Sequence, residues 1–211
     1  MRKYILPIIS GLLFIGLIVL VKTYDVSAIG PLETSVGLAS INNYVHNLTG
    51  VNMFWYNLTD LFGFVAIGVV GTFGLIGFIQ LIKRKSLFEV DNDLFLLGIL
   101  YVIILSIYIL FEVKIINYRP VIMPGETLPE SSFPSSHTIL IIVVMASAIV
   151  VLDNYVKNVK ICKILRVLFG IILVITVVGR LLSGAHWFSD ILGGILISTC
   201  LISTFCALRN Y

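Results

Sequence analysis

The chain has 211 residues, of which 59% are hydrophobic and 12% are charged, and its formal net charge is +3. Soluble globular proteins are about 45–50% apolar and about 25% charged, so this chain has too little charge to cover a water-facing surface. The composition excludes an ordinary soluble domain, a disordered chain and a secreted disulfide scaffold, and no basic run is long enough to indicate nucleic-acid binding. It predicts an integral membrane protein with a single domain over residues 1–211.

Six segments have the length and apolar character of membrane spans, since a spanning helix needs about 20 mainly apolar residues. They cover residues 5–21, 61–82, 94–113, 139–152, 164–182 and 188–208, the fourth being extended by small residues before it. We therefore predict an all-α bundle of six transmembrane helices. The first segment could instead be a signal peptide, but its apolar stretch exceeds the usual ~7–15 residues, so we expect it to be retained.

The distribution of basic residues predicts the orientation, because cytoplasmic loops hold an excess of Lys and Arg. With six spans, one side carries Arg2, Lys3, Lys83, Arg84, Lys85, Lys157, Lys160, Lys163, Arg166 and Arg209. The other side carries Lys22, Lys114, Arg119 and Arg180. Both termini are therefore expected in the cytoplasm. The longest outer loop contains an imperfectly amphipathic stretch at about residues 31–50, which is read as a possible helix lying along the outer interface.

Two outer loops carry a set of polar residues that the rest of the chain lacks. The loop after the third span contains Arg119-Pro120 and Pro134-Ser135-Ser136-His137, and the segment 179–190, which includes the adjoining ends of the fifth and sixth spans, contains Arg180, His186 and Asp190. Ionisable groups at membrane depth cost about 2.5–3.5 kcal/mol even on insertion scales, so by default they indicate function. The convergence of these segments on one face predicts an active site at the outer face.

The residue types in this set suit a phosphate group. The two arginines present planar donor forks to phosphate oxygens, and the backbone at Ser135 and Ser136 precedes a span, where a helix N-terminus binds anions. Asp190 is expected to share a helical turn with His186 and to orient it as a nucleophile. His137 would then protonate the leaving oxygen. These residues predict phosphoryl transfer.

The same residues could also have purely structural roles or bind a metal. His186 and Asp190 could form a purely structural hydrogen-bonded pair, and a terminal arginine such as Arg180 often anchors a helix at the interface. A metal site from His137, His186 and Asp190 is conceivable from the ligand types. No metal-binding spacing supports it, however, and two nearby arginines would repel a cation. We expect no metal and no cofactor.

The three motifs resemble those of the type 2 phosphatidic acid phosphatase superfamily, whose pattern is Lys-x6-Arg-Pro, Pro-Ser-Gly-His and Ser-Arg-x5-His-x3-Asp. Arg119-Pro120, residues 134–137 and Arg180-x5-His186-x3-Asp190 match this pattern in order. The resemblance implies a metal-independent enzyme with His186 as the phosphorylated nucleophile, Asp190 as its orienting carboxylate and His137 as the proton donor. It further implies that the phosphate is held by Arg119, Arg180, Ser135 and the backbone at Ser136.

The chain departs from the family pattern at three positions. The position of the family's first lysine is occupied by Glu112, and Lys114 is two residues further on, about 200° around a helix. Lys114 would therefore reach the phosphate only through a distortion of the helix. The motif glycine is replaced by Ser136, and the serine of the third motif is replaced by Gly179.

The sequence therefore predicts a lipid phosphatase of a bacterial cytoplasmic membrane, with lipid phosphates and membrane lipids as its partners. Polyprenyl pyrophosphates, phosphatidylglycerophosphate and phosphatidic acid all suit the predicted site, and the sequence does not choose among them or indicate an oligomeric state. Glu126 and Glu130, in the loop before the second motif, are candidates for screening the head group. The alternatives are a lipid-phosphate binder or flippase without turnover, which Glu112 keeps open, and a transporter, for which no inverted repeat is evident.

Overall fold

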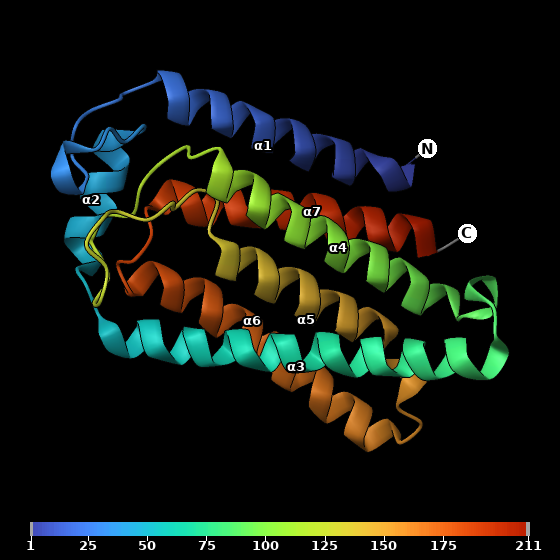
Figure 1. Cartoon of the computed structure of the whole chain (residues 1–211). Coiled ribbons are helices and arrows are strands. Elements are labelled where there is room, and N and C mark those ends of the chain that lie inside the picture. The colour runs from blue at the N-terminus through green and yellow to red at the C-terminus, as the bar shows by residue number, and fades with distance from the viewer. Residues whose placement is uncertain (1, 210–211) are drawn as a thin grey trace.

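The computed structural model describes residues 2–209 and shows an all-α bundle (Figure 1). Its long helices are α1 (Ile5–Thr23), α3 (Met53–Arg84), α4 (Asn92–Val113), α5 (Ser136–Tyr155), α6 (Val159–Leu182) and α7 (Phe188–Arg209). The shorter helix α2 (Ala39–Thr49) and 3-10 turns at Arg2–Tyr4, Pro31–Glu33 and Leu87–Glu89 lie between or before them. Six of these helices are long and apolar enough to cross a membrane, so the predicted six-span architecture is confirmed.

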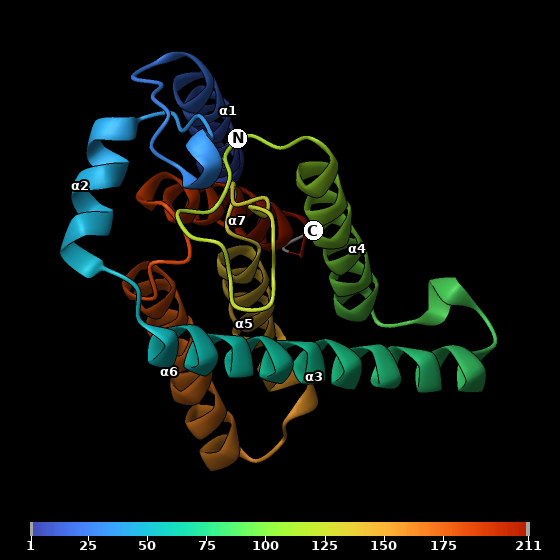
Figure 2. The same ribbon diagram turned by 60° about the vertical axis from the view of Figure 1, so that its left-hand side comes forward.

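Helix α5 lies at the centre of the bundle. It packs against α3, α4, α6 and α7, which surround it in Figure 2. Its fully buried side chains include Ile141, Val143, Val144, Met145, Ala148 and Val151. In hydrocarbon, burying such side chains removes little contact with water, so close packing between helices holds them together instead.

The outward faces of the bundle are apolar. Large hydrophobic side chains more than half exposed occur on α1, α3, α4 and α6, for example Leu12, Phe64, Val102 and Val174. A water-facing protein rarely presents such continuous apolar area. These surfaces suit the hydrocarbon layer that six spans would cross.

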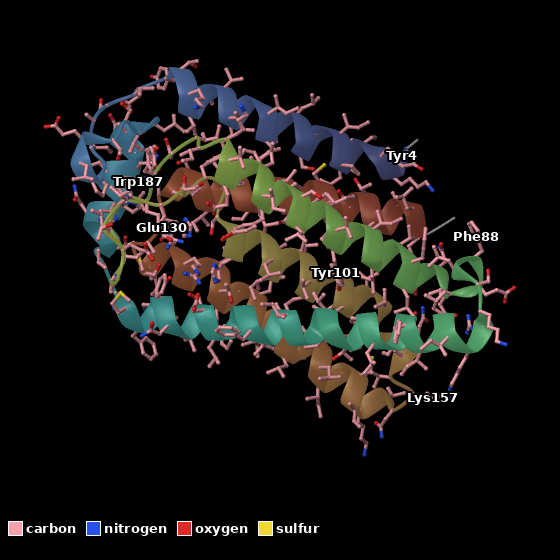
Figure 3. All side chains as sticks on the ribbon, in the orientation of Figure 1. Tyr4, Phe88, Tyr101, Glu130, Lys157 and Trp187 are labelled. Carbon is pink, nitrogen blue, oxygen red and sulfur yellow. The ribbon has the colours of Figure 1, made fainter. Side chains whose placement is uncertain are left out.

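The two ends of the bundle differ in character. Both chain ends lie at one end, while α2 and the loop between α4 and α5 cover the opposite end (Figure 1). Figure 3 places Tyr4, Phe88 and Lys157 at the first end, and Glu130 and Trp187 at the second. The loop between α4 and α5 and the turn before α7, which carry Arg119 and His186, therefore lie at the second end (Figure 3).

Several helix boundaries differ from the prediction because polar side chains cap the helices earlier than hydropathy suggests. Helix α3 begins at Met53 rather than at residue 61, since the side chain of Asn52 accepts hydrogen bonds from the backbone N–H of Phe54 (3.0 Å) and Trp55 (3.4 Å). Such a cap satisfies N–H groups that the first turn leaves unpaired. The polar first turns of α3, including Asp60, thereby become part of a spanning helix.

The predicted helix at about residues 31–50 corresponds to α2, Ala39–Thr49. Ile41, Tyr44 and Leu48 follow the helical spacing of three and four residues and are all exposed. An apolar side facing away from the bundle is typical of a helix at a membrane surface, and the location of α2 at the interface stays a prediction.

Candidate active site

The loop between α4 and α5 folds back on itself and brings two motifs together. An isolated antiparallel bridge joins Tyr118 to Ser131. Next to it, Arg119 N–H donates to the carbonyl of Glu130 (3.0 Å), and Ser132 N–H donates to the carbonyl of Asn117 (3.0 Å). The pairing places Arg119 beside the segment that leads into the start of α5.

The second motif forms the N-terminus of α5. Ser135 is the N-cap, and its fully buried hydroxyl accepts from the N–H (3.4 Å) and hydroxyl (3.0 Å) of Thr138. The backbone N–H of Ser135 donates to the carbonyl of Asp190 (3.0 Å), which joins this end of α5 to α7. Ser136 and His137 occupy the first turn and line the cavity described below. The Ser135 hydroxyl only accepts in this cap, so its own proton stays available to donate, and its expected contact with phosphate stays a prediction.

His186 lies in the turn before α7, not on its first helical turn as the spacing to Asp190 suggested. Its Nδ1 is 3.8 Å from Asp190 Oδ2, too long for a direct hydrogen bond. The same carboxylate oxygen accepts from the backbone N–H of Trp187 (2.8 Å) and from the hydroxyl of Ser132. The Ser132 hydroxyl is also 3.5 Å from His186 Nδ1. Ser132 therefore contacts both members of the pair.

Ser132 is a site residue that the sequence reasoning missed. The only available signal was its position in the serine-rich run before Pro134, and serine runs are common in loops. Its contact with Asp190 depends on the pairing of two distant segments of one loop, which no local sequence pattern shows.

Arg180 is completely buried near the end of α6. Its Nη2 is 3.0 Å from Asp60 Oδ1, and its guanidinium lies over the ring of Tyr56 at 4.8 Å. His137 Nε2 is 2.9 Å from the same oxygen of Asp60. Asp60, which the sequence reasoning also missed, thus joins one motif residue from α5 to another from α6.

Several buried nitrogen atoms of the site have no hydrogen-bond partner among the described residues. They are Arg119 Nε and Nη1, Arg180 Nε and Nη1, and His186 Nε2, together with His137 Nδ1. Arg119 Nε lies 3.2 Å from the carboxylate of Glu130 without forming a hydrogen bond. Buried polar groups are almost always paired, so a set of unpaired cationic donors indicates that an anion completes the site.

The electrostatic environment keeps His186 neutral. Burial lowers its pKa well below the usual value, and the nearby Arg119 and Arg180 lower it further. The buried ring therefore retains an unprotonated nitrogen at neutral pH. Because Nδ1 faces Asp190 and Ser132, the nitrogen left for chemistry is Nε2.

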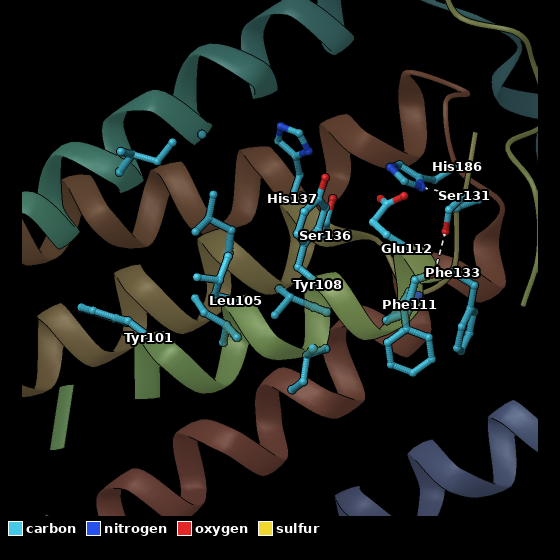
Figure 4. Close-up of a pocket in the computed structure, with 18 of the residues that line it drawn as sticks. Tyr101, Leu105, Tyr108, Phe111, Glu112, Ser131, Phe133, Ser136, His137 and His186 are labelled. Carbon is cyan, nitrogen blue, oxygen red and sulfur yellow. Dashed lines mark hydrogen bonds between the residues drawn. The ribbon is translucent and has the colours of Figure 1, made fainter. Parts of the chain in front are cut away.

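A cavity of about 630 Å³ extends from these residues into the bundle, between α3, α4 and α5 (Figure 4). Its polar end contains Asp60, Glu112, Arg119, His137 and His186. The rest of its wall is mostly apolar and includes Phe64, Ile67, Tyr101, Leu105, Tyr108 and Phe111. In Figure 4, Glu112 and His186 lie close together, while Tyr101 and Leu105 line the far part.

A second apolar cavity of about 680 Å³ continues along the same pair of helices. It shares Val70, Tyr101 and Val102 with the first and is otherwise lined by α3, α4 and the turn between them. We call the two together the α3–α4 cleft. It joins a charged end to a long apolar channel beside exposed side chains such as Phe64 and Val102.

The structure shows where the residues that depart from the family pattern lie. Glu112 lines the cavity, whereas Lys114 is exposed at the C-cap of α4 and does not line it. A Cβ at Gly179 would lie 2.7 Å from Thr59 Cγ2 and 3.0 Å from the ring of Trp55. A serine at this position would therefore collide with α3, which explains the glycine. Glu126 is exposed in the loop and Glu130 lies beside Arg119.

Comparisons with known proteins agree with this geometry. The family model described as the PAP2 superfamily matches residues 66–211. The crystal structure of the first transmembrane PAP2-type phosphatidylglycerolphosphate phosphatase, from Bacillus subtilis, is similar with a TM-score of 0.68 and 17% sequence identity. The match covers 98% of this chain and 96% of that one. A search of curated proteins finds no match. The chain belongs to the PAP2 superfamily, as a membrane phosphatase of that family.

Proposed function

We propose that this protein hydrolyses the phosphate or pyrophosphate head group of a membrane lipid through a phosphohistidine at His186. The observation that carries the proposal is the set of unpaired cationic donors and the unpaired His186 Nε2 at the charged end of an otherwise apolar cleft. Phosphoryl transfer depends mainly on positioning and on stabilising charge on the equatorial oxygens. Arg119 and Arg180 supply that charge, so the reaction is expected to need no metal.

In the first half-reaction, His186 Nε2 forms a bond to phosphorus while the bond from phosphorus to the lipid oxygen breaks. His137 gives its proton to the leaving oxygen, and the lipid departs as an alcohol or, from a pyrophosphate, as a monophosphate. In the second half, water attacks the phosphohistidine, His137 accepts a proton from that water, and inorganic phosphate is released. Asp190 and Ser132 hold His186 Nδ1 throughout, which keeps Nε2 directed at phosphorus.

The α3–α4 cleft supports a lipid as the substrate. Its walls beyond the polar end are apolar, and exposed apolar residues border it. An acyl or isoprenoid chain would lie along α3 and α4, with its phosphate at Arg119 and His186. Phosphatidylglycerophosphate, phosphatidic acid and polyprenyl pyrophosphates all have this form. The first is the substrate named for the similar Bacillus subtilis protein.

We further propose that both chain ends face the cytoplasm and that the site opens at the outer face of a bacterial cytoplasmic membrane. The support is the excess of Lys and Arg at the end of the bundle that carries the termini. A cysteine-accessibility measurement on Lys157→Cys and Glu126→Cys in intact cells tests this. Labelling of residue 126 from outside, with residue 157 protected, is expected, and the reverse pattern would contradict the orientation.

The function is tested by inorganic phosphate release from purified protein in detergent with EDTA. Phosphatidylglycerophosphate, phosphatidic acid and a C55 isoprenyl pyrophosphate are the substrates, and the variants are His186→Ala and, as a control at the opposite end of the bundle, Lys157→Ala. We expect turnover by the wild type and the control, no turnover by His186→Ala, and a 32P-labelled histidine after acid-free trapping. Turnover abolished by EDTA would contradict the mechanism.

One observation favours a second candidate, a lipid-phosphate binder or flippase without turnover. Glu112 places a carboxylate in the cavity where the family pattern has a lysine. Such a protein would retain a labelled lipid phosphate in detergent without releasing phosphate. The release assay therefore separates the two candidates.

A further inference from the structure

Asp60 is the acidic residue with the closest contacts to the motif histidine of α5. Its Oδ1 is 2.9 Å from His137 Nε2 and 3.0 Å from Arg180 Nη2, and the residue lines the cavity. It lies in α3, before the start of the family match at residue 66. None of the three motifs contains it.

The two histidines of the site use opposite nitrogens. His186 faces Asp190 through Nδ1, which leaves its Nε2 without a partner. His137 faces Asp60 through Nε2, which leaves its Nδ1 buried and without a partner. Asp60 contacts His137 directly, whereas Asp190 reaches His186 through the hydroxyl of Ser132, and in both cases the opposite ring nitrogen is left available. In each ring, one nitrogen faces the orienting group and the other nitrogen is the one that reacts.

The charges near His137 show why the carboxylate matters. Arg180, Arg119 and His186 are close to the ring, and Asp60 is the acidic group whose charge acts on it. Burial disfavours a protonated imidazole most, and repulsion from the two arginines disfavours it further. An adjacent carboxylate offsets that repulsion, and the hydrogen bond from Nε2–H favours the protonated ring.

We infer that Asp60 is the positioning residue for the proton donor, an inference that rests on the proposed phosphatase function. Once a phosphate dianion lies between the arginines and offsets their charge, Asp60 holds His137 protonated, with Nε2–H donated to Asp60 and Nδ1–H directed at the leaving oxygen. As His186 Nε2 bonds to phosphorus, the Nδ1–H bond breaks, the proton moves to the leaving oxygen, and the phosphorus–oxygen bond breaks. His137 is left neutral and still donates Nε2–H to Asp60.

The test is the dependence of rate on the leaving group, because a good leaving group needs little protonation. Phenyl phosphate and p-nitrophenyl phosphate are similar in size and differ mainly in the basicity of the departing oxygen. For Asp60→Asn we expect kcat on phenyl phosphate to fall about 100-fold, the low end for loss of general acid catalysis. On p-nitrophenyl phosphate the fall is expected to be less than about tenfold.

Two further variants separate this role from a structural one. Asp153→Asn is the matched control, since Asp153 also pairs with an arginine, Arg166, but at the opposite end of the bundle; it should leave both rates unchanged. Asp60→Glu retains the carboxylate and should recover most of the phenyl phosphate rate. In a His137→Ala background, Asp60→Asn should change the ratio of the two rates by less than twofold.

The outcomes are distinct from those of the function test. Equal losses on both aryl phosphates for Asp60→Asn would overturn the inference, since they would show a general effect on Arg180 or on folding. If Asp60→Asn does not fold, an unchanged ratio of the two rates in wild type and His137→Ala would overturn it. Failure of the wild type to release phosphate from any lipid or aryl phosphate would overturn the proposed function itself.

Discussion

Replacing Asn42 with alanine removes three hydrogen bonds, two of which join α2 to the start of α7. Asn42 is fully buried. Its amide donates to the carbonyl of Gly37 (2.8 Å) and to the hydroxyl of Ser189 (2.9 Å), and its oxygen accepts from the backbone N–H of Ser189 (3.0 Å). The N–H of Ser189 lies in the first turn of α7, where backbone N–H groups have no carbonyl acceptor within the helix. Ser189 is in turn adjacent to Asp190.

The magnitude of the loss follows from these contacts. At about 1 kcal/mol net for each bond, Asn42→Ala costs about 3 kcal/mol. For a chain of this size, 1 kcal/mol lowers Tm by roughly 2–4 °C, so we expect a decrease of about 6–12 °C. Displacement of Asp190 should lower kcat by about tenfold with little change in KM, because misplacement of a reacting group by 1 Å can cost about 100-fold.

The assay is thermal unfolding in detergent together with phosphate release. Asn43→Ala is the control, since Asn43 is the neighbouring residue on the same helix but is exposed; its effect should stay within about 0.5 kcal/mol. An Asn42→Ala protein that melts with the wild type would refute the energetic argument. A large fall in Tm with unchanged kcat would show that α2 stabilises the bundle without positioning Asp190.

Three other predictions concern the site and its packing. Because burial lowers the pKa of His186, the nucleophile stays neutral as the pH falls, and the acid-side loss of kcat/KM should lie below the free-histidine value of about 6.5; a midpoint above it in a pH–rate profile would contradict this. Gly193→Ala would place a Cβ 2.8 Å from the ring of buried Phe133 and should cost about 1–3 kcal/mol in thermal unfolding, whereas Gly170→Ala, with nothing within 4 Å, should cost none. Glu112→Gln should lower KM for a lipid phosphate about fivefold, the effect of removing roughly 1 kcal/mol of charge repulsion, and an unchanged or higher KM would show that Glu112 does not face the head group.

The parts of the fold that depend on local composition could be predicted from the sequence. The six spans follow from hydropathy alone, because the length of an apolar segment is matched to the bilayer thickness. Arg119, His137 and His186 could be identified as site candidates because ionisable groups at span ends are costly. The structure places all three on one cavity.

The remaining site residues could not be predicted, because their roles depend on contacts between segments far apart in the chain. Asp60 looked like a residue of a loop before the second span, until the Asn52 cap extended α3 over it. Ser132 and Asn42 acquire their roles through Asp190 and Ser189, 58 and 147 residues away. The expected helical pairing of His186 with Asp190 was wrong because α7 begins at Phe188, two residues after the histidine.

The α3–α4 cleft has a consequence for how the rate should be measured. Its long apolar part borders the surface that faces hydrocarbon, so a lipid substrate reaches the site by diffusion within the membrane plane. The concentration that governs saturation is then the mole fraction of substrate among all lipids or detergent molecules, not the amount per volume of buffer. Other lipids with similar chains compete for the same space. Adding inert detergent at a fixed bulk substrate concentration should therefore slow turnover, as simple surface dilution requires.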